Sequence, residues 1–339
     1  MDISTLSTRL DSTIAEIDFS GVVQIAQGGH VLHERVRGFA ERAHRVPNTR
    51  DTEFALASGT KSFTALAVTS LVADGVLGLD ERVQGFLGVA GELVDPAVTV
   101  RHLLAHTSGM GDYLDEDQIE DIEDHTLEVP VLRLASPADF LPMLRARSTM
   151  KFSPGSRFKY CNSGYVVLAL LIEAVSGRSY YEVVEDRVFA PSGMLATAFP
   201  RLDALPGSAA SGYLPQRGWR LNHLHLPVRG GGDGGAYSSV DDIARFWTAL
   251  LDGRVVPSEW VAEMIRPQST RPANSRAYGL GFWLAPARDA IHMEGNDPGI
   301  SFRSSFEPAT GLLYTVISNT TSGAWPIVRA IEANLAELP

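Results

Sequence analysis

The chain has 339 residues, of which 45% are hydrophobic and 20% charged, and its formal net charge is −11 at pH 7. This composition is typical of a soluble globular protein and excludes collagen-like, coiled-coil and disordered chains. Because an acidic chain repels phosphate backbones and anionic membranes, we predict neither a nucleic-acid nor a membrane partner. The one cysteine, Cys161, excludes an intrachain disulfide and a thiolate metal cage.

The first eighteen residues show helical spacing rather than a secretory signal. A signal has a basic start followed by a run of about 7–15 apolar residues, and residues 1–18 contain one Arg and no such run. Their apolar side chains recur at the spacing of one helix face, at Leu6, Leu10, Ile14 and Ile17. No stretch approaches the 18 or more apolar residues of a membrane span. We therefore predict a cytoplasmic protein.

Strand patterns occupy both ends of the chain, and helical patterns occupy the middle. A hairpin is predicted over 21–36, around the turn at Gly28 and Gly29. The segments that follow are, in chain order, a helix at 61–76, mostly helical chain at 77–200 with a buried helix at 163–176, a Gly- and Pro-rich stretch at 206–236, a helix at 238–251, strands at 278–284, 299–306 and 311–318, and a helix at 325–337. This order predicts a sheet built from both termini, a helical insertion, and a cleft between them.

Three features invite other chemistry but do not meet its requirements. His102 and His106 stand four apart and could bind zinc from one helix face, but no Glu follows the first His. The run Gly230–Gly235 is not followed by the Gly-Lys-Ser/Thr of a phosphate loop, and Cys161 is interpreted as a structural thiol. We predict no metal and no cofactor.

A candidate nucleophile lies where a strand-like segment meets the helix at 61–76. Residues three apart lie nearly on one helix face, so Lys61 would place its amine beside the Ser58 hydroxyl. Serine needs an adjacent base, and burial or the field of a helix N-terminus lowers the pKa of a lysine enough for this role. The Ser58 backbone N–H could hold an oxyanion. The alternative is a capped helix with a solvent-exposed lysine.

A second segment places Tyr160 and Asn162 two residues apart after the turn at 153–155. A tyrosinate near a lysine ammonium can act as a general base and then return the proton to a leaving group. Asn162 could bridge Lys61 and a substrate carbonyl through its amide.

A third segment, His292–Gly299, contains Gly295 within a strand-like pattern. A glycine in a strand marks close backbone approach, which a substrate laid along a sheet edge requires. The N–H of Asn296 would then be the second oxyanion donor, and His292 is a further candidate substrate contact.

At these residues the chain resembles the serine β-lactamase and penicillin-binding-protein superfamily, in its class C and carboxylesterase-like branch. The resemblance is carried by Ser58–Lys61, Tyr160–Asn162 and the segment 292–299, with Arg101–Gly109 as a further similar stretch. It implies an α/β (α+β) fold, with a central antiparallel sheet flanked by helices, a helical subdomain and a site between them. It also implies an acyl-enzyme at Ser58, with Lys61 and Tyr160 as the base system.

The resemblance predicts one catalytic unit, with a sheet subdomain of about 1–57 plus 230–339 and a helical subdomain of about 58–229. The third segment departs from the family, because Met293-Glu294-Gly295 stands where the family has Lys-Thr-Gly or His-x-Gly. Met293 cannot bind a carboxylate, and Glu294 would repel one. The prediction is a serine hydrolase acting on a small neutral ester or amide. The alternatives are a D-amino-acid peptidase or amidase, a weak β-lactamase, and a non-catalytic sensor or binding module.

Overall fold

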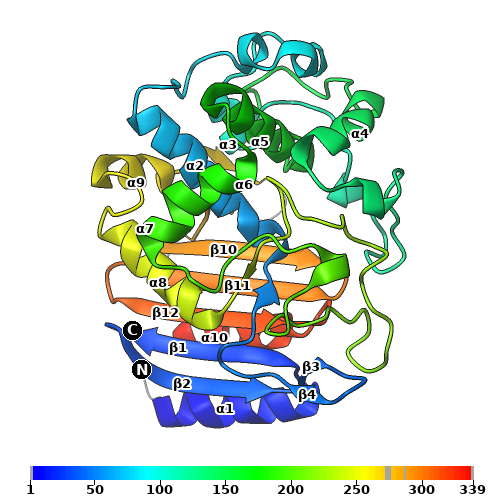
Figure 1. Cartoon of the computed structure of the whole chain (residues 1–339). Helices are drawn as coiled ribbons and strands as arrows, with labels where there is room; N and C mark the ends of the chain where they lie inside the picture. Colours follow the sequence, from blue (N-terminus) through cyan, green and yellow to red (C-terminus); the bar gives the residue numbers. More distant parts are fainter. Residues whose placement is uncertain (1–2, 272–275, 286–287, 337–339) are drawn as a thin grey trace.

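The computed structural model describes residues 3–271, 276–285 and 288–336, and an antiparallel sheet forms its centre. Eight strands follow one another across it in the order β2-β1-β12-β11-β10-β9-β8-β7 (Figure 1). These strands are β1 (Gly21–Gln27), β2 (His30–Arg37), β7 (Ser269–Thr270), β8 (Ala277–Tyr278), β9 (Trp283–Ala285), β10 (Ala290–Asp297), β11 (Ile300–Glu307) and β12 (Leu312–Ser318). Two-stranded sheets join β3 (Phe39–Glu41) to β4 (Val46–Pro47) and β5 (Phe54–Ala55) to β6 (Tyr237–Ser238).

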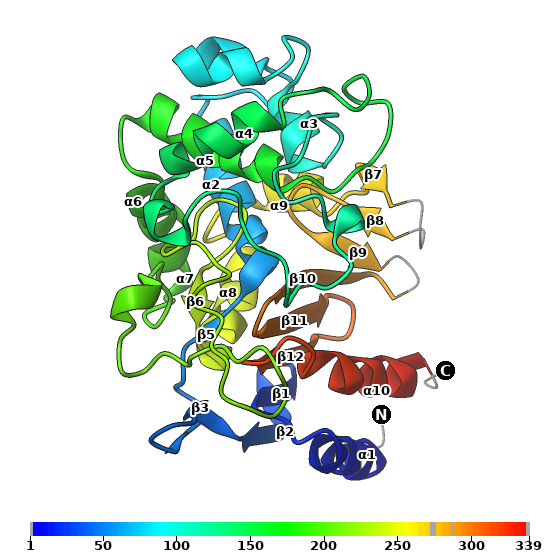
Figure 2. The ribbon, with the colours of Figure 1, turned by 90° about the vertical axis from the view of Figure 1, so that its right-hand side faces the viewer.

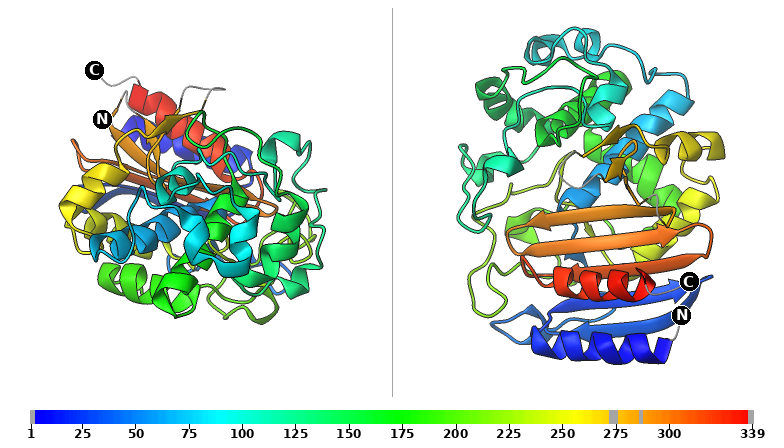
Figure 3. Two further views of the ribbon diagram at one scale, coloured as in Figure 1. Left: turned by 90° about the horizontal axis from the view of Figure 1, so that it is seen from above. Right: turned by 180° about the vertical axis from the view of Figure 1, so that it is seen from behind.

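Each face of the sheet is covered by helices, because apolar side chains alternate between the two faces of a strand. Val23 and Val316 belong to the cluster that includes the apolar faces of α1 (Ile3–Glu16) and α10 (Ala324–Ala336). Their chain neighbours Val22 and Ile317 belong to the larger core on the opposite face. Figure 2 shows α1 and α10 on one side of the sheet, and the rear view in Figure 3 shows both lying across it.

The other face carries the remaining helices, and α2 runs through their centre (Figure 1). All residues of α2 from Lys61 to Val72 are buried. The helices on this side are α2 (Lys61–Ala73), α3 (Val100–Leu104), α4 (Leu141–Ala146), α5 (Asn162–Ser176), α6 (Tyr180–Val184), α7 (Ala190–Ser192), α8 (Val240–Leu251) and α9 (Ser258–Met264). The start of α2 is thus held between the sheet and the helical part.

The structure confirms most of the predicted elements. The hairpin over 21–36 is β1 and β2, the helix at 163–176 is α5, and the helix at 238–251 is α8. Ser239 caps α8 by accepting a hydrogen bond from the Asp242 N–H at 3.2 Å. The final helix is α10, and its predicted last residue, 337, lies outside the described residues.

The prediction of mostly helical chain over 77–200 is wrong. Between α2 and α5 the chain forms only two α-helices, of five and six residues, joined by 3-10 turns and loops. Residues 114–135 illustrate the cause, since they lack a sustained apolar period of 3.6 residues. The division into a sheet part and a helical part with the boundaries given above stays a prediction. In the described part of the chain, no helix is long and apolar enough to cross a membrane.

Candidate active site

The chain reaches Ser58 through a turn with an unusual backbone conformation. Ala57 has φ of +46°, in the left-handed region that residues with a side chain rarely adopt. Thr60 holds the turn, because its hydroxyl donates to the Ala57 carbonyl at 2.8 Å and accepts from the Ala236 N–H at 3.0 Å. Ser58 is thereby presented, half-buried, in a short 3-10 turn (Ala57–Thr60) that leads directly into α2.

Lys61, the first residue of α2, is 1% exposed and directs its amine to three oxygen atoms. Its Nζ lies 2.8 Å from Ser58 Oγ, 2.8 Å from Asn162 Oδ1 and 2.5 Å from the Asp233 carbonyl oxygen. Burial lowers the pKa of the Lys61 ammonium, and nearby carboxylates, Asp233 foremost, oppose this effect. A lysine with a lowered pKa is neutral over a wider pH range than an exposed lysine.

Tyr160 reaches Ser58 from the segment that precedes α5. Its ring stacks on Trp283, with centroids 6.0 Å apart and 7° between the planes, and lies 4.2 Å from the His106 ring. Lys61 Nζ is 5.0 Å from the centroid of the Tyr160 ring. Desolvation raises the pKa of the Tyr160 hydroxyl well above its usual value, while a hydrogen bond with Ser58 acts in the opposite direction. The phenol therefore keeps its proton at neutral pH.

Strand β10 lies directly beside the turn that carries Ser58, and Gly295 makes this approach possible. A Cβ on Gly295 would lie 2.1 Å from the Leu56 carbonyl oxygen and 2.8 Å from the Ser58 nitrogen. Any side chain would therefore force the strand and the turn apart. The backbone of β10, with the Asn296 N–H one residue further on, is thus in contact with the backbone that carries the Ser58 N–H.

His292 is not brought to Ser58. It is 6% exposed and lines a cavity between the sheet and α10, on the other side of β10. Met293 is buried in the main core. The Asn296 side chain accepts a hydrogen bond from Trp325 Nε1 of α10 at 2.9 Å, so only its backbone is available to a reacting group at Ser58.

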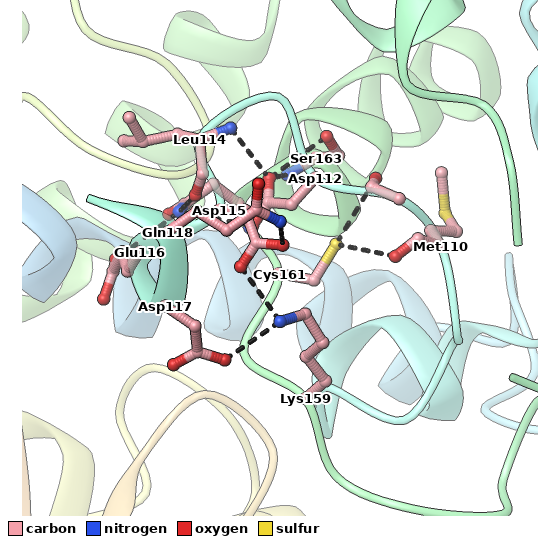
Figure 4. A network of polar contacts seen from close by, with 12 residues as sticks. Met110, Asp112, Leu114, Asp115, Glu116, Asp117, Gln118, Lys159, Cys161 and Ser163 are labelled. Atoms are coloured by element: carbon pink, nitrogen blue, oxygen red, sulfur yellow. Dashed lines mark hydrogen bonds and ion pairs between the residues drawn. The ribbon is translucent and has the colours of Figure 1, made fainter. Parts of the chain in front are cut away.

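An aspartate that the sequence analysis missed anchors the start of α5. Figure 4 shows the Asp112 carboxylate beside Leu114 and Ser163. It accepts hydrogen bonds from the N–H groups of Asn162 at 2.7 Å, Ser163 at 2.9 Å and Leu114 at 3.3 Å. Burial nevertheless raises the pKa of Asp112 to about 7. These bonds fix the position of Asn162, which in turn accepts the hydrogen bond from Lys61.

Two cavities meet at Ser58. The larger, of about 820 Å³, is lined mostly by apolar side chains, and its polar residues include Asn162, Asp233 and Asp297. The smaller, of about 380 Å³, is lined by residues of both chain halves, namely Ser58, Glu116, Tyr160, Arg271, Trp283, Glu294, Gly295 and Asn296. The sequence analysis assigned no role to Asp233 or Asp297, although Asp233 lies within the Gly230–Gly235 run and Asp297 within the segment 292–299.

The Gly230–Gly235 run forms a wall of the larger cavity. The Gly231 N–H donates to the Gly234 carbonyl at 2.8 Å, so the loop closes on itself. A Cβ on Gly232 would lie 2.3 Å from the Tyr165 carbonyl oxygen, which places the loop tightly against α5. This packing delivers the Asp233 carbonyl to Lys61.

The two histidines considered for zinc do not share a helix face. The helix α3 ends at Leu104, and His106 has φ of +56° beyond it. His106 Nδ1 instead accepts the Cys161 N–H at 3.1 Å. Over the residues that the structure describes, no three His, Cys, Asp or Glu side chains form a group that could hold a metal ion. Cys161 is buried and its thiol pKa is raised well above its usual value, which agrees with a structural thiol.

Burial of a lysine amine against a serine hydroxyl serves no purpose in packing, since it costs the desolvation of the amine. Beside a half-buried phenol, and with the backbone of β10 close against the Ser58 turn, such a pair is suited to attack on a carbonyl carbon. The fold and this geometry together define the class of the protein as a hydrolase that uses serine as its nucleophile.

Comparison with known proteins agrees with this class. The model of the beta-lactamase family matches residues 10–337, so the chain belongs to this family and to the serine β-lactamase and penicillin-binding-protein superfamily. Curated relatives include penicillin-binding protein 4* of Bacillus subtilis, 30% identical over 87% of this chain and 67% of its own length. Esterase EstB of Burkholderia gladioli is 31% identical over 83% of this chain and 80% of its own length.

A D-aminopeptidase of Brucella anthropi is 30% identical over 78% of this chain, but the match spans only 48% of that enzyme. Among solved structures, a penicillin-binding protein from Bacillus halodurans is 36% identical, with a TM-score of 0.88 over 96% of this chain and 99% of that chain. The predicted fold class, an antiparallel sheet flanked by helices, is confirmed by this likeness and by the strand pairing.

Proposed function

We propose that the protein hydrolyses small esters or amides through an acyl-enzyme formed on Ser58. The observation that carries the proposal is the contact of 2.8 Å between the buried Lys61 amine and the Ser58 hydroxyl. A solvent-exposed lysine, the alternative left open by the sequence, is incompatible with a side chain that is 1% exposed.

The contacts of Lys61 suit a neutral amine that acts as the general base. Its two N–H groups can be donated to Asn162 Oδ1 and to the Asp233 carbonyl, which leaves the nitrogen lone pair directed at the Ser58 hydroxyl. The Ser58 proton then passes to Lys61 as Oγ forms its bond to the carbonyl carbon. The lowered pKa of Lys61 supports this protonation state.

Tyr160 supplies the proton that the leaving group needs. Its raised pKa favours a neutral phenol, so it serves as a general acid rather than as a tyrosinate base. The N–H groups of Ser58 and Asn296 hold the negative oxygen of the tetrahedral intermediate. The Lys61 ammonium then returns its proton to the Tyr160 phenolate, which restores the neutral amine and the neutral phenol. Water attacks the acyl-enzyme and gives a proton to the Lys61 amine, and this proton passes to Ser58 Oγ as the acid leaves.

Met293 stands where the family has a cation, and this favours a neutral leaving group over a carboxylate. Met293 lies in the core and presents no charge to the smaller cavity, which is lined by Glu116, Glu294 and Arg271, and Glu294 is itself paired with Arg276 and Arg303. The relationship to esterase EstB supports an ester substrate. The D-aminopeptidase relative keeps a D-amino-acid peptidase or amidase as the second candidate. Initial rates with nitrocefin, a short-chain p-nitrophenyl ester and a D-amino-acid amide separate the candidates.

The test is to label the protein with a fluorophosphonate and to locate the adduct by peptide mass. We expect the adduct on Ser58 and loss of ester hydrolysis in Ser58→Ala. Ser156→Ala removes an exposed serine hydroxyl elsewhere on the chain and serves as the control. An adduct elsewhere, or unchanged turnover in Ser58→Ala, contradicts the proposal. A stable acyl adduct of an ester at Ser58 without turnover identifies a sensor instead.

A cytoplasmic location and the absence of a nucleic-acid partner stay predictions of the sequence. Fractionation of the native host and filter binding with labelled DNA and RNA would test them separately.

A further inference from the structure

The polar residues of the larger cavity include Asp297, whose carboxyl group has no role in the proposed reaction. We propose that this cavity holds the acyl group of the substrate, and that Asp297 binds an ammonium group carried on that acyl group close to the scissile carbonyl. The inference rests on the proposed function and names the substrate class of the same site. The preferred substrate is then an ester or amide of an apolar amino acid with a free amino group.

The position of Tyr160 decides which cavity takes which part of the substrate. A general acid must reach the leaving atom, and Tyr160 lines the smaller cavity with Trp283. The leaving group therefore occupies that side of Ser58. The acyl group is left with the larger cavity, whose walls include Leu127, Leu226 and Ile300. Burial of an apolar side chain there contributes binding energy in proportion to the area removed from water.

Asp297 ends strand β10, two residues beyond Gly295, and its carboxyl group lies on the wall of this cavity. A Cβ on Gly234 would lie 3.9 Å from Asp297 Oδ2, so the glycine loop leaves room directly in front of the carboxyl group. The described part of the chain offers this carboxyl group no hydrogen-bond donor. A carboxylate that is partly removed from water is stable only when it is paired. A ligand bound in the cavity would supply this partner.

The other carboxyl groups near Lys61 have partners within the chain. Asp112 accepts three backbone N–H groups, and Asp233 accepts the Tyr113 hydroxyl. Asp297 differs from both, although it lines the same cavity as Asp233. Of these three carboxyl groups, that of Asp297 has no contact in the described part of the chain that would explain its presence by folding.

The charge balance at the site also favours a cationic ligand. The pKa of Asp297 is raised to about 7, chiefly by burial, with Lys61 acting in the opposite direction and Glu116 and Asp233 adding to the rise. The charged groups that act on Asp297 are thus one cation, Lys61, and an excess of carboxyl groups, Glu116 and Asp233, while Arg271 lies with Glu116 on the smaller cavity. An ammonium group bound at Asp297 offsets this excess, whereas a carboxylate on the acyl group would be repelled.

The experiment compares two substrates that differ only in the ammonium group. Phenylalanine methyl ester, in each enantiomer, and 3-phenylpropionic acid methyl ester are hydrolysed in a pH-stat by wild type and by the isosteric Asp297→Asn. We expect kcat/KM of wild type to favour the better phenylalanine enantiomer by about tenfold or more, as for a hydrogen-bonded charge pair. In Asp297→Asn the ratio of the two values should fall close to one, mainly through KM.

Asp203→Asn, which removes an exposed carboxylate outside both cavities, is the matched control and should keep the wild-type ratio. As a second measurement, 2-phenylethylammonium should inhibit neutral-ester hydrolysis more strongly than 2-phenylethanol in wild type but not in Asp297→Asn. Ester hydrolysis with a ratio that Asp297→Asn does not move overturns this inference and leaves the proposed function intact. Absence of Ser58-dependent hydrolysis of either ester overturns both.

Discussion

The contact between β10 and the Ser58 turn predicts that one added methyl group removes most of the activity. In Gly295→Ala the new Cβ would lie 2.1 Å from the Leu56 carbonyl oxygen and 2.8 Å from the Ser58 nitrogen. Both obstacles are backbone atoms, so the strand and the turn must separate by roughly 1 Å before ordinary contact distances return. This movement separates the N–H groups of Ser58 and Asn296, which we propose as the two donors to the oxyanion.

Loss of one oxyanion donor lowers kcat by about 10²–10³-fold, which corresponds to about 2.7–4 kcal/mol of transition-state stabilisation. We expect a loss of this size in Gly295→Ala, while overpacking lowers the free energy of unfolding by about 1–3 kcal/mol. Because these effects differ in kind, the assay combines steady-state hydrolysis of a p-nitrophenyl ester with urea denaturation.

The control for this prediction is Gly85→Ala, since a Cβ on Gly85 would meet no atom within 4 Å. It should leave both kcat and the free energy of unfolding close to wild type. If Gly295→Ala is folded and keeps kcat within about threefold of wild type, the oxyanion reasoning is refuted. Equal losses in both variants would refute the steric argument, because the structure places an obstacle at one position and none at the other.

Three further outcomes are expected from the site. Lys61→Met keeps the buried volume but removes the base, so kcat should fall by about 10²–10⁴-fold, and a fall of less than about tenfold contradicts the assignment. Tyr160→Phe keeps the ring on Trp283 and removes the proposed acid. The rate of methyl-ester hydrolysis should therefore fall far more than the rate of p-nitrophenyl-ester hydrolysis, because the p-nitrophenolate leaving group needs no proton. Equal decreases in the two rates contradict this. Asp297 has a folded pKa of about 7 against an ordinary 3.8, so its contribution to the free energy of unfolding is present below pH 4 and is lost as pH rises through 7. The free energy of unfolding of Asp297→Asn should therefore equal that of wild type near pH 4 and exceed it at pH 8 by at most about 4 kcal/mol. Urea denaturation at the two pH values measures this difference. A difference that does not change with pH contradicts the raised pKa.

The local part of the site was predictable from sequence because helix geometry relates residues three apart. Ser58 and Lys61 are neighbours on one turn of chain, and the structure places their side chains 2.8 Å apart. The close approach at Gly295 was also predictable, since a glycine within a strand weakens it and is typical of places where another backbone comes near. By contrast, no local rule shows that Tyr160 lies between Trp283 and His106, because these contacts depend on the packing of distant elements.

The carboxylates around Lys61 could not be predicted for the same reason. Asp112 follows a glycine in a loop, and Asp233 lies within a glycine run, so neither has a periodic or motif context. The acidic segment 115–124 contains a three-residue 3-10 turn, and its Glu116 lines the smaller cavity. Acidic residues at high density in sequence do not reveal which one turns towards a site.

The carboxylates also constrain how Lys61 can act as a base. Full ionisation of Asp233 and Asp297 would stabilise the Lys61 ammonium and hold the proton that the amine must give up. Burial of these carboxyl groups, which raises their pKa, limits this effect near neutral pH. An ammonium group bound at Asp297 would go further, because it pairs with that carboxylate and adds a positive charge near the amine. Both changes lower the pKa of Lys61, so a cationic substrate would promote the neutral amine required to take the proton of Ser58.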